Sequence, residues 1–580
     1  MAVSKSEATH LPEAGPPRRR WASFAAPSVV SALTLLALVA TGPQFGMVWD
    51  EGYTVLRERL LDEWFERASS AGSRGQLRRA FDKAELDHYW QFSREEPHGH
   101  PPFYALLGLA GWRLSHRWLR PLQAYRFGAM LLTAATAGVI CAHLSRRRAP
   151  WASALAAVLI PLMPRTFAHA HYAHYDMPMT CLWLLAQVAF VASLNSRWWA
   201  APFGVALGLC AGTKFSGLFA VVPAVAWVVL VEVLPGRGSH SGRRTEVIHS
   251  PRPGLRTLLI AVPLAVLSIY AIQPPWWIEP ITGPDRFVSS NLTRAKTQPL
   301  ASRYFGKIYE FALPWHNTIV LTAITTPVLV LALGLIGIGA CLARRRTGPW
   351  ALIWPLSWAT LMIVRALPNA PGHDGIRQFL PSVVSLAILA GLGAAWLADR
   401  IPPGWRLAAV PILVAAVVGE CLVGIARTYP YTDSFYNVAF GGLKAAERYG
   451  FELTYYWETT GPEFWDWVRT QARRKPVKLC LSMGSTNHDL LREWGEIPSN
   501  VQIMHLNNRN IDMMERPDYY VQQRRWGLYY PDDFLLERHG HPRFAIRREG
   551  VDLLRVFPFD EMMEACRHTM DPLLLRHLHR

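Results

Sequence analysis

The stretch SVVSALTLLALVATGPQFGMVWDEG, residues 28–52, decides the fold class. Residues 28–47 form an apolar run long enough to cross a membrane as a helix, and an acidic pair, Asp50 and Glu51, follows it. Three arginines precede the run, as in a signal peptide, but no small-x-small cleavage site follows it. We therefore expect a retained membrane helix with carboxylates at its far end.

Ten further apolar runs follow the first, and 51% of the 580 residues are hydrophobic. Reading each run as a spanning helix predicts an α-helical multi-pass membrane protein with about eleven transmembrane helices. Their approximate limits are 28–47, 124–144, 151–168, 177–194, 200–213, 216–233, 257–273, 317–343, 350–367, 378–398 and 406–426.

Arginines in the short connections set the orientation. The loops 145–150, 195–199, 344–349 and 399–406 and the linker 234–256 all carry Arg, so we place them in the cytoplasm. This arrangement accounts for the net charge of +17 without nucleic acid. It predicts a cell (inner) membrane protein whose outer loops, 48–123 and 274–316, and C-terminal region lie on the external or periplasmic side.

The expected domains are three. Residues 1–27 form a cytoplasmic tail, residues 28–426 the membrane domain, and residues 427–580 a small external α/β domain in which helical and strand-like patterns alternate. A short apolar run at 102–115, too short to cross, is expected to lie in the membrane interface.

Unusual polar residues gather at the predicted outer ends of the spans. Ionisable residues at membrane depth are costly and usually functional, so their presence on one face predicts an external active site. The group comprises Asp50, Glu51, His98, His100, His169, His171, His174, Asp176, Lys214, His373, Asp374 and Arg377.

Each member also has a structural interpretation. Asp50 and Glu51 suit a solvated helix end, the histidines an interfacial cluster without a ligand, and Lys214 a side chain extending toward lipid headgroups. Gly334, Gly337 and Gly339 fit helix packing.

Four strings resemble the C-type (GT-C) membrane glycosyltransferases. They are Trp49-Asp50-Glu51, His100-Pro101-Pro102-Phe103-Tyr104, Tyr175-Asp176-Met177-Pro178 and Gly212-Thr213-Lys214, and the likeness extends over about residues 20–460. Their order and spacing are similar to those of glycosyltransferase family 39, which includes protein O-mannosyltransferases, and of the lipid A aminoarabinose transferases. The resemblance implies the GT-C fold and transfer of a hexosyl or pentosyl group from a polyprenyl-phosphate-linked sugar to a protein, lipid or glycan acceptor.

The sequence departs from that pattern in two places. Aminoarabinose transferases have an Arg soon after the acidic pair, whereas here the nearest cations are Arg57 and Arg59. The residue before the first Pro of the second string is His100, as in mannosyltransferases, and not an acid. The sugar donor therefore does not follow from the resemblance.

The proposed chemistry is an inverting displacement in which an acceptor attacks the anomeric carbon while phosphate leaves. Asp50 is the candidate general base; Glu51 would orient the acceptor or support Asp50, and Asp176 would bind acceptor or sugar. Lys214, Arg57 and Arg377 are candidates for binding the departing phosphate.

No cofactor is required by this scheme, because the carrier lipid brings an activated sugar. A divalent cation is nevertheless possible, held by His98 with His100 or by His171 with His174.

Two other classes stay open. A transporter or flippase of lipid-linked glycans would place ionisable residues near helix midpoints and show repeat symmetry. A non-catalytic membrane scaffold would not require Asp50, Asp176 and Lys214 to converge.

Overall fold

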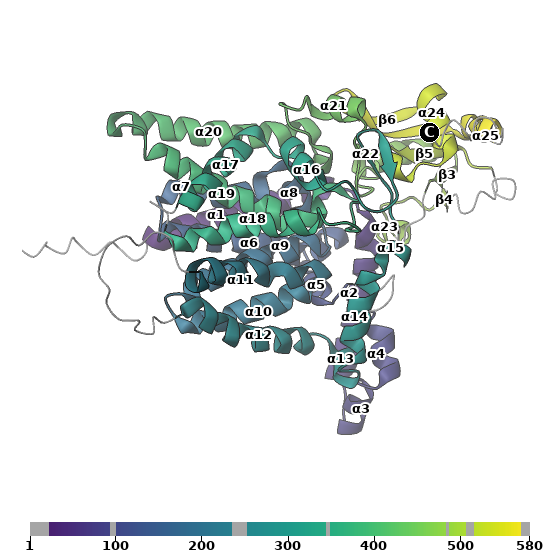
Figure 1. Cartoon of the computed structure of the whole chain (residues 1–580). Helices are drawn as coiled ribbons and strands as arrows, with labels where there is room; N and C mark the ends of the chain where they lie inside the picture. Colours follow the sequence, from purple (N-terminus) through teal and green to yellow (C-terminus); the bar gives the residue numbers. More distant parts are fainter. Residues whose placement is uncertain are drawn as a thin grey trace, which may run out of the picture.

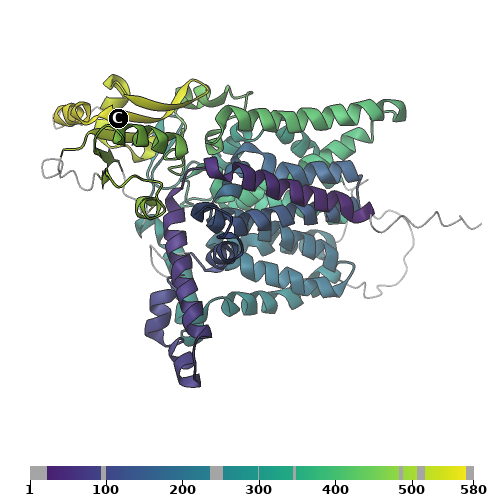
Figure 2. The same cartoon turned by 180° about the vertical axis from the view of Figure 1, so that it is seen from behind.

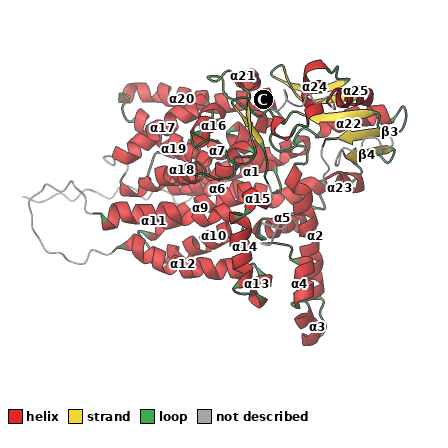
Figure 3. Cartoon of the chain, turned by 45° about the vertical axis from the view of Figure 1, so that its right-hand side comes forward, coloured by secondary structure: helices red, strands yellow, loops and turns green. Residues whose placement is uncertain are grey.

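The computed structural model describes residues 22–92, 100–234, 252–297, 299–343, 348–482, 487–505 and 516–569. Long helices lie side by side and form the body of the molecule, and a five-stranded sheet lies at one end of them (Figures 1 and 3). Helices α2–α4 and α13–α14 form an arm beside that same end (Figure 1). Seen from behind, α1 covers the helical body (Figure 2). His98, the arginines 18–20 and most of the cytoplasmic tail and linker predicted above lie outside the described residues.

The helical body contains all eleven segments predicted to span. Its elements are α1 (Ala22–Thr41), α6 (Pro121–Ser145), α7 (Pro150–Leu162), α8 (Pro164–His171), α9 (Asp176–Ser193), α10 (Ala200–Ala211), η3 (Phe215–Val221), α11 (Val222–Val228), η4 (Val229–Val233), α12 (Pro253–Ala271), α16 (Asn317–Thr325), α17 (Val328–Ala343), η5 (Pro349–Leu352), α18 (Ile353–Val364), η6 (Gly375–Phe379), α19 (Leu380–Ala398) and α20 (Pro403–Thr428).

Among the described residues, seven helices are long and apolar enough to cross a membrane, and α7 with α8, bent by 64°, would make an eighth. These features make the chain a multi-pass membrane protein. α17 and the segment Pro349–Val364 are apolar but shorter, and the predicted span 317–343 is broken into α16 and α17. The total of eleven spans stays a prediction.

Burial distinguishes central from peripheral helices. The α9 span and the span that contains α19 are each 89% buried inside the protein, whereas α12 and α20 are each only 17% buried. An apolar helix that proteins do not cover faces lipid. The centre of the body is therefore built on α9 and α19, and both begin at the same end.

The segments outside the helical body form the long helix α2 and several shorter elements. They are α2 (Trp49–Ser69), α3 (Arg74–Arg79), α4 (Lys83–Tyr89), α5 (Phe103–Ser115), η2 (Arg197–Trp199), α13 (Pro274–Ile278), α14 (Thr282–Leu292), α15 (Arg294–Thr297) and a hairpin of β1 (Ser302–Tyr304) and β2 (Lys307–Tyr309). α5 confirms a helix in the short apolar run at 102–115.

The C-terminal region combines helices with a mixed sheet, as its alternating pattern predicts. Strand order is β4-β3-β5-β7-β6, in which β3 pairs in parallel with β4 and β5, and β7 runs antiparallel to β5 and β6. The elements are η7 (Thr432–Ser434), α21 (Gly442–Tyr449), α22 (Pro462–Ala472), β3 (Val477–Leu481), α23 (Asn487–Glu493), β4 (Val501–His505), β5 (Tyr519–Gln523), η9 (Trp526–Leu528), α24 (Pro531–His539), β6 (Phe544–Arg548), β7 (Val551–Pro558) and α25 (Phe559–Thr569).

Candidate active site

Three helix starts and one C-terminal segment meet at the end of the body that carries the sheet. Asp50 lies in the first turn of α2, Asp176 is the first residue of α9, and Arg377 lies in η6, immediately before α19. Segment 454–460, between α21 and α22, adds Tyr456. Carboxylates are stabilised at helix N-termini, which favours acids at these places.

The hydrogen bonds that hold the Asp50 side chain all go to one of its two carboxylate oxygens. Its Oδ2 accepts hydrogen bonds from the hydroxyls of Tyr175, at 2.5 Å, and Tyr456, and from Arg377 Nη1 at 3.1 Å. Within the described part of the chain, Oδ1 accepts none. The Asp50 side chain is 22% exposed, so this site carboxylate remains reachable.

The charge state of Asp50 follows from these contacts. Burial acts to raise its pKa, but Arg377 and the hydrogen bonds from Tyr175 and Tyr456 outweigh burial and hold the pKa of Asp50 well below its usual value. The carboxylate is therefore ionised throughout the neutral range.

Asp176 lies between two cations. Its Oδ1 is 2.6 Å from Lys214 Nζ, and its Oδ2 is 3.5 Å from Arg377 Nη1. The side chain is fully buried. Asp176 therefore contacts both cations of the site but is covered from solvent. Asp50, in contrast, remains partly exposed.

Lys214 follows the turn after α10 and precedes η3. Its ammonium lies 5.0 Å from the centre of the Tyr175 ring as well as beside Asp176. Burial lowers the pKa of Lys214 to about 8, against the opposing effect of Asp176, and the charges of Arg377 and Arg365 lower it further. The ammonium therefore titrates near neutrality.

Arg377 links the helical body to the C-terminal region. It contacts Asp50, Asp176 and Asp374, and its guanidinium lies 4.0 Å from the centre of the Tyr456 ring. Asp374 in turn forms an ion pair with Arg525, whose Nη2 lies 2.6 Å from Asp374 Oδ1. Arg525 comes from the segment after β5, so residues separated by about 475 positions build one charged network.

Glu51 is engaged by the protein itself. Both of its oxygens are 2.7 Å from Arg126 nitrogens, and the backbone amides of Ala173 and Val48 also donate to them. Glu51 and Arg126 are both fully buried. These contacts leave no room for an acceptor at Glu51 and fit its other predicted role, supporting Asp50 by fixing the start of α2.

The predicted histidines separate into different surroundings. His100 packs on the Tyr175 ring, with ring centres 3.8 Å apart, and burial together with Arg294 and Lys214 lowers its pKa. His174 Nδ1 accepts the amide of Asp176 at 3.0 Å, and burial lowers its pKa to about 3. His171 lies elsewhere, bonded to Phe167 and Thr41.

Of the two predicted metal-binding pairs, the structure describes only that of His171 with His174, because His98 lies outside the described residues. In the parts of the chain that the structure describes, no three His, Cys, Asp or Glu side chains are grouped as metal ligands. Both ring nitrogens of His171 are occupied by protein atoms, so the expected pair of His171 with His174 does not form.

Arg57 is connected to the site through Tyr104. Its Nη1 donates to the Tyr104 hydroxyl at 2.9 Å, and the Tyr104 ring packs against Tyr175. Arg59 instead pairs with Glu493 on the surface. Of the three predicted phosphate-binding cations, the structure brings Lys214 and Arg377 together at Asp176.

Three further side chains belong to this site: Tyr175, Tyr456 and Arg525. Tyr175 is next to Asp176 in the string Tyr175-Asp176-Met177-Pro178, which is a usable sequence signal. Tyr456 and Arg525 lie in the C-terminal region, far along the chain, and no local pattern links them to Asp50 or Asp374.

Comparison with known proteins agrees with this fold. Residues 119–268 match the family described as dolichyl-phosphate-mannose-protein mannosyltransferase. ArnT from Cupriavidus metallidurans in the apo state is 13% identical with a TM-score of 0.51, over 91% of this chain and 97% of that one. No curated protein matches the chain in sequence.

Two further solved structures are similar at lower scores, too low to support a structural argument. The Archaeoglobus fulgidus oligosaccharyltransferase in the apo form is 12% identical with a TM-score of 0.43, over 87% of this chain and 70% of that one. The S. cerevisiae protein O-mannosyltransferase Pmt1-Pmt2 complex is 14% identical with a TM-score of 0.30, over 49% and 38%. The chain therefore shares the fold of ArnT, and its residues 119–268 match the dolichyl-phosphate-mannose-protein mannosyltransferase family.

Proposed function

We propose that the chain transfers a sugar from a polyprenyl-phosphate carrier to an acceptor on the outer face of the cell membrane. The observation that carries this proposal is the arrangement of Asp50, with Oδ2 held by three donors and Oδ1 without a partner in the described residues. A fixed, ionised and partly exposed carboxylate oxygen can take up the proton of an acceptor, which is the task of a general base.

The reaction that we propose is a single displacement. An acceptor hydroxyl or amine attacks the anomeric carbon, the bond from that carbon to the phosphate oxygen breaks, and the acceptor proton passes to Asp50 Oδ1. The carrier leaves as a phosphate monoester with an additional negative charge. Attack from the side opposite to the leaving group inverts the anomeric centre.

Lys214 is the main candidate for stabilising that new charge. Its ammonium has one partner at 2.6 Å and further hydrogens to donate to a phosphate. Arg365 and Arg294 add positive potential around Lys214 and His100. Preorganised cations at the leaving group lower the barrier because they need no rearrangement as charge develops.

Asp176 and Arg377 are proposed as positioning residues. Asp176 is buried between Lys214 and Arg377, and Arg377 in turn donates to Asp50. This chain of contacts connects the proposed phosphate site to the proposed base. Arg57, which donates to the Tyr104 hydroxyl, lies at the outer edge of the site in this scheme.

The donor class rests on the relatives. The matched family description names dolichyl-phosphate mannose, and ArnT from Cupriavidus metallidurans has also been solved bound to undecaprenyl phosphate. We carry over the polyprenyl-phosphate carrier and leave the sugar and the acceptor open.

In the deciding experiment, the purified full-length chain is incubated in detergent with undecaprenyl phosphate linked to mannose, aminoarabinose or another sugar. We expect slow release of free sugar from one donor without acceptor, and none from the Asp50→Asn variant. If vesicles containing the chain move such lipids across the bilayer without cleaving them, the flippase alternative is correct. If no donor is bound or cleaved, the scaffold alternative is favoured.

A further inference from the structure

A basic pocket lies at the end of the helical body opposite to the candidate active site. Its walls are the loop between α6 and α7, the end of α19 and the start of α20, and its volume is about 740 Å³. The residues that decide its chemistry are Arg148 and Arg406, the apolar Trp151, Leu407 and Val410, and Asp399.

α19 fixes the distance between the two sites. Arg377 precedes its first residue, Leu380, and Asp399 follows its last residue, Ala398. A helix of 19 residues is about 28 Å long at 1.5 Å per residue, which is close to the thickness of a bilayer's hydrocarbon core. The pocket therefore lies at the opposite membrane interface from Asp50.

Positive charge at the pocket is poorly compensated. Arg406 donates to the backbone carbonyls of Ile401, at 2.7 Å, and Asp399, at 3.0 Å, and these fix its guanidinium. No described carboxylate pairs with Arg406 or with Arg146, and Arg406 Nη1 has no described acceptor. Fixed guanidinium groups bind phosphate well because their planar donors match its oxygens.

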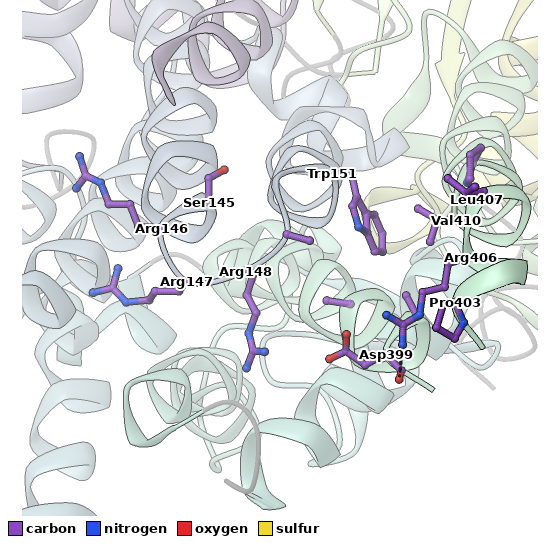
Figure 4. Close-up of a pocket in the computed structure, with 14 residues that line it drawn as sticks. Ser145, Arg146, Arg147, Arg148, Trp151, Asp399, Pro403, Arg406, Leu407 and Val410 are labelled. Carbon is purple, nitrogen blue, oxygen red and sulfur yellow. Dashed lines mark hydrogen bonds between the residues drawn. The ribbon is translucent and has the colours of Figure 1, made fainter. Parts of the chain in front are cut away.

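The same pocket has an apolar wall that continues onto the lipid-facing side of α20. In Figure 4, Trp151, Val410 and Leu407 lie together, with Arg148, Asp399 and Arg406 along one edge of that group. Leu407 is 87% exposed in the isolated protein, and α20 as a whole is little covered by other helices. A phosphate at Arg406 could therefore be joined to acyl chains that lie along α20.

We propose that this pocket binds the headgroup of an anionic phospholipid. Basic pockets between membrane helices at the cytoplasmic surface suit lipid phosphates, and the apolar wall distinguishes a lipid from a free phosphate ion. The bound lipid fills the space between α20 and the α6–α7 loop, and thereby fixes the position of a helix that few protein contacts hold.

The test measures lipid binding to the purified full-length chain in detergent by native mass spectrometry. Phosphatidylglycerol, phosphatidylcholine and inorganic phosphate are the three probes. We expect saturable binding of phosphatidylglycerol, tighter than that of phosphatidylcholine, and little competition from millimolar phosphate. Equal binding of the two lipids, or displacement by inorganic phosphate alone, would overturn the proposal.

Two variants locate the site. Arg406→Gln should weaken phosphatidylglycerol binding about tenfold, since one charge-assisted hydrogen-bonding group is lost. Arg400→Gln is the matched control, because Arg400 is exposed, lies at the same end of the helical body and is not among the residues that line the pocket. An equal loss with the control would mean that only overall charge matters. If Arg406→Gln fails to fold, Arg406→Lys should retain the preference for phosphatidylglycerol over phosphatidylcholine, and loss of that preference would contradict the assignment.

Discussion

Asp50 carries the chemistry that we assign to this protein, and its substitution is the sharpest test at the scale of single residues. Asp50→Asn keeps the size and the accepting oxygen but removes the base. We expect single-turnover transfer to fall about 100- to 10,000-fold, the usual contribution of general-base catalysis, with donor affinity nearly unchanged. Near-normal chemistry in folded Asp50→Asn protein would assign the base elsewhere.

Tyr456 tests whether the C-terminal region positions that base. Tyr456→Phe removes one hydrogen bond to an ionised oxygen while retaining the ring stacked with Arg377. The single-turnover rate should fall about 10- to 150-fold because such hydrogen bonds contribute about 1.5–3 kcal/mol, and donor affinity should change little. Tyr455→Phe is the control, since the Tyr455 hydroxyl bonds Tyr436 and not Asp50. Equal rate losses in both variants would indicate a general effect on folding.

The lowered pKa of Lys214 predicts how the activity falls at alkaline pH. This pKa, lowered to about 8 by burial, means that the ammonium is mostly charged at pH values well below 8 and that this charge is lost as pH rises through that value. The kcat/KM for donor should therefore decline above about pH 8, because this ratio reports the free enzyme. Lys214→Arg keeps its charge and should abolish that decline, even if its activity is lower overall. An unchanged alkaline limit in this variant would remove Lys214 from donor binding.

At the scale of elements, the glycines of α17 differ in what they permit. A Cβ on Gly337 would lie 2.0 Å from the Leu389 carbonyl oxygen of α19, whereas a Cβ on Gly339 would meet nothing within 4 Å. Gly337 therefore fulfils the packing role predicted from sequence, and Gly339 does not. Gly334 is intermediate, 3.1 Å from a flexible Leu386 side-chain atom.

This difference predicts opposite outcomes for two neighbouring substitutions. Gly337→Val should separate α17 from α19 and destabilise the protein by about 1–3 kcal/mol or more, the typical cost of overpacking. Gly339→Val should leave stability unchanged. The midpoint of thermal unfolding in detergent measures both. Similar midpoints for the two variants would mean that α17 and α19 do not approach as described.

The start of α2 is a second case in which an element depends on distant partners. Glu51 caps its own helix by accepting the Val48 amide, and Arg126 of α6 and Ala173 before α9 hold the same carboxylate. Breaking a buried ion pair leaves an uncompensated charge, so we expect the geometry around Asp50 to depend on Glu51.

For the whole molecule, orientation in the membrane is the central prediction. Tags in 234–256 should be cytoplasmic, and tags after residue 430 should be external. Cysteine labelling with a membrane-impermeant reagent on intact cells distinguishes the two sides. An accessible tag in 234–256 and a protected C-terminus would place Asp50 on the cytoplasmic side and would contradict transfer on the outer face.

The C-terminal region contributes more to the site than its sequence indicates. The sequence predicts only a small external α/β domain there, yet Tyr456 bonds the candidate base and Arg525 pairs with Asp374. We therefore propose that this region completes the catalytic site. Its removal should abolish transfer rather than alter acceptor range alone.

The sequence by itself determined the membrane class, the helical segments and the strings around Asp50, Asp176 and Lys214, because apolar length and polar residues at helix ends are local properties. Only the tertiary structure decided which oxygen of Asp50 has no partner among the described residues, which acid is buried, and which histidines lie away from the site. It also added Tyr456 and Arg525. These features depend on side chains hundreds of residues apart that packing brings into contact, and no period or spacing along the chain encodes such a contact.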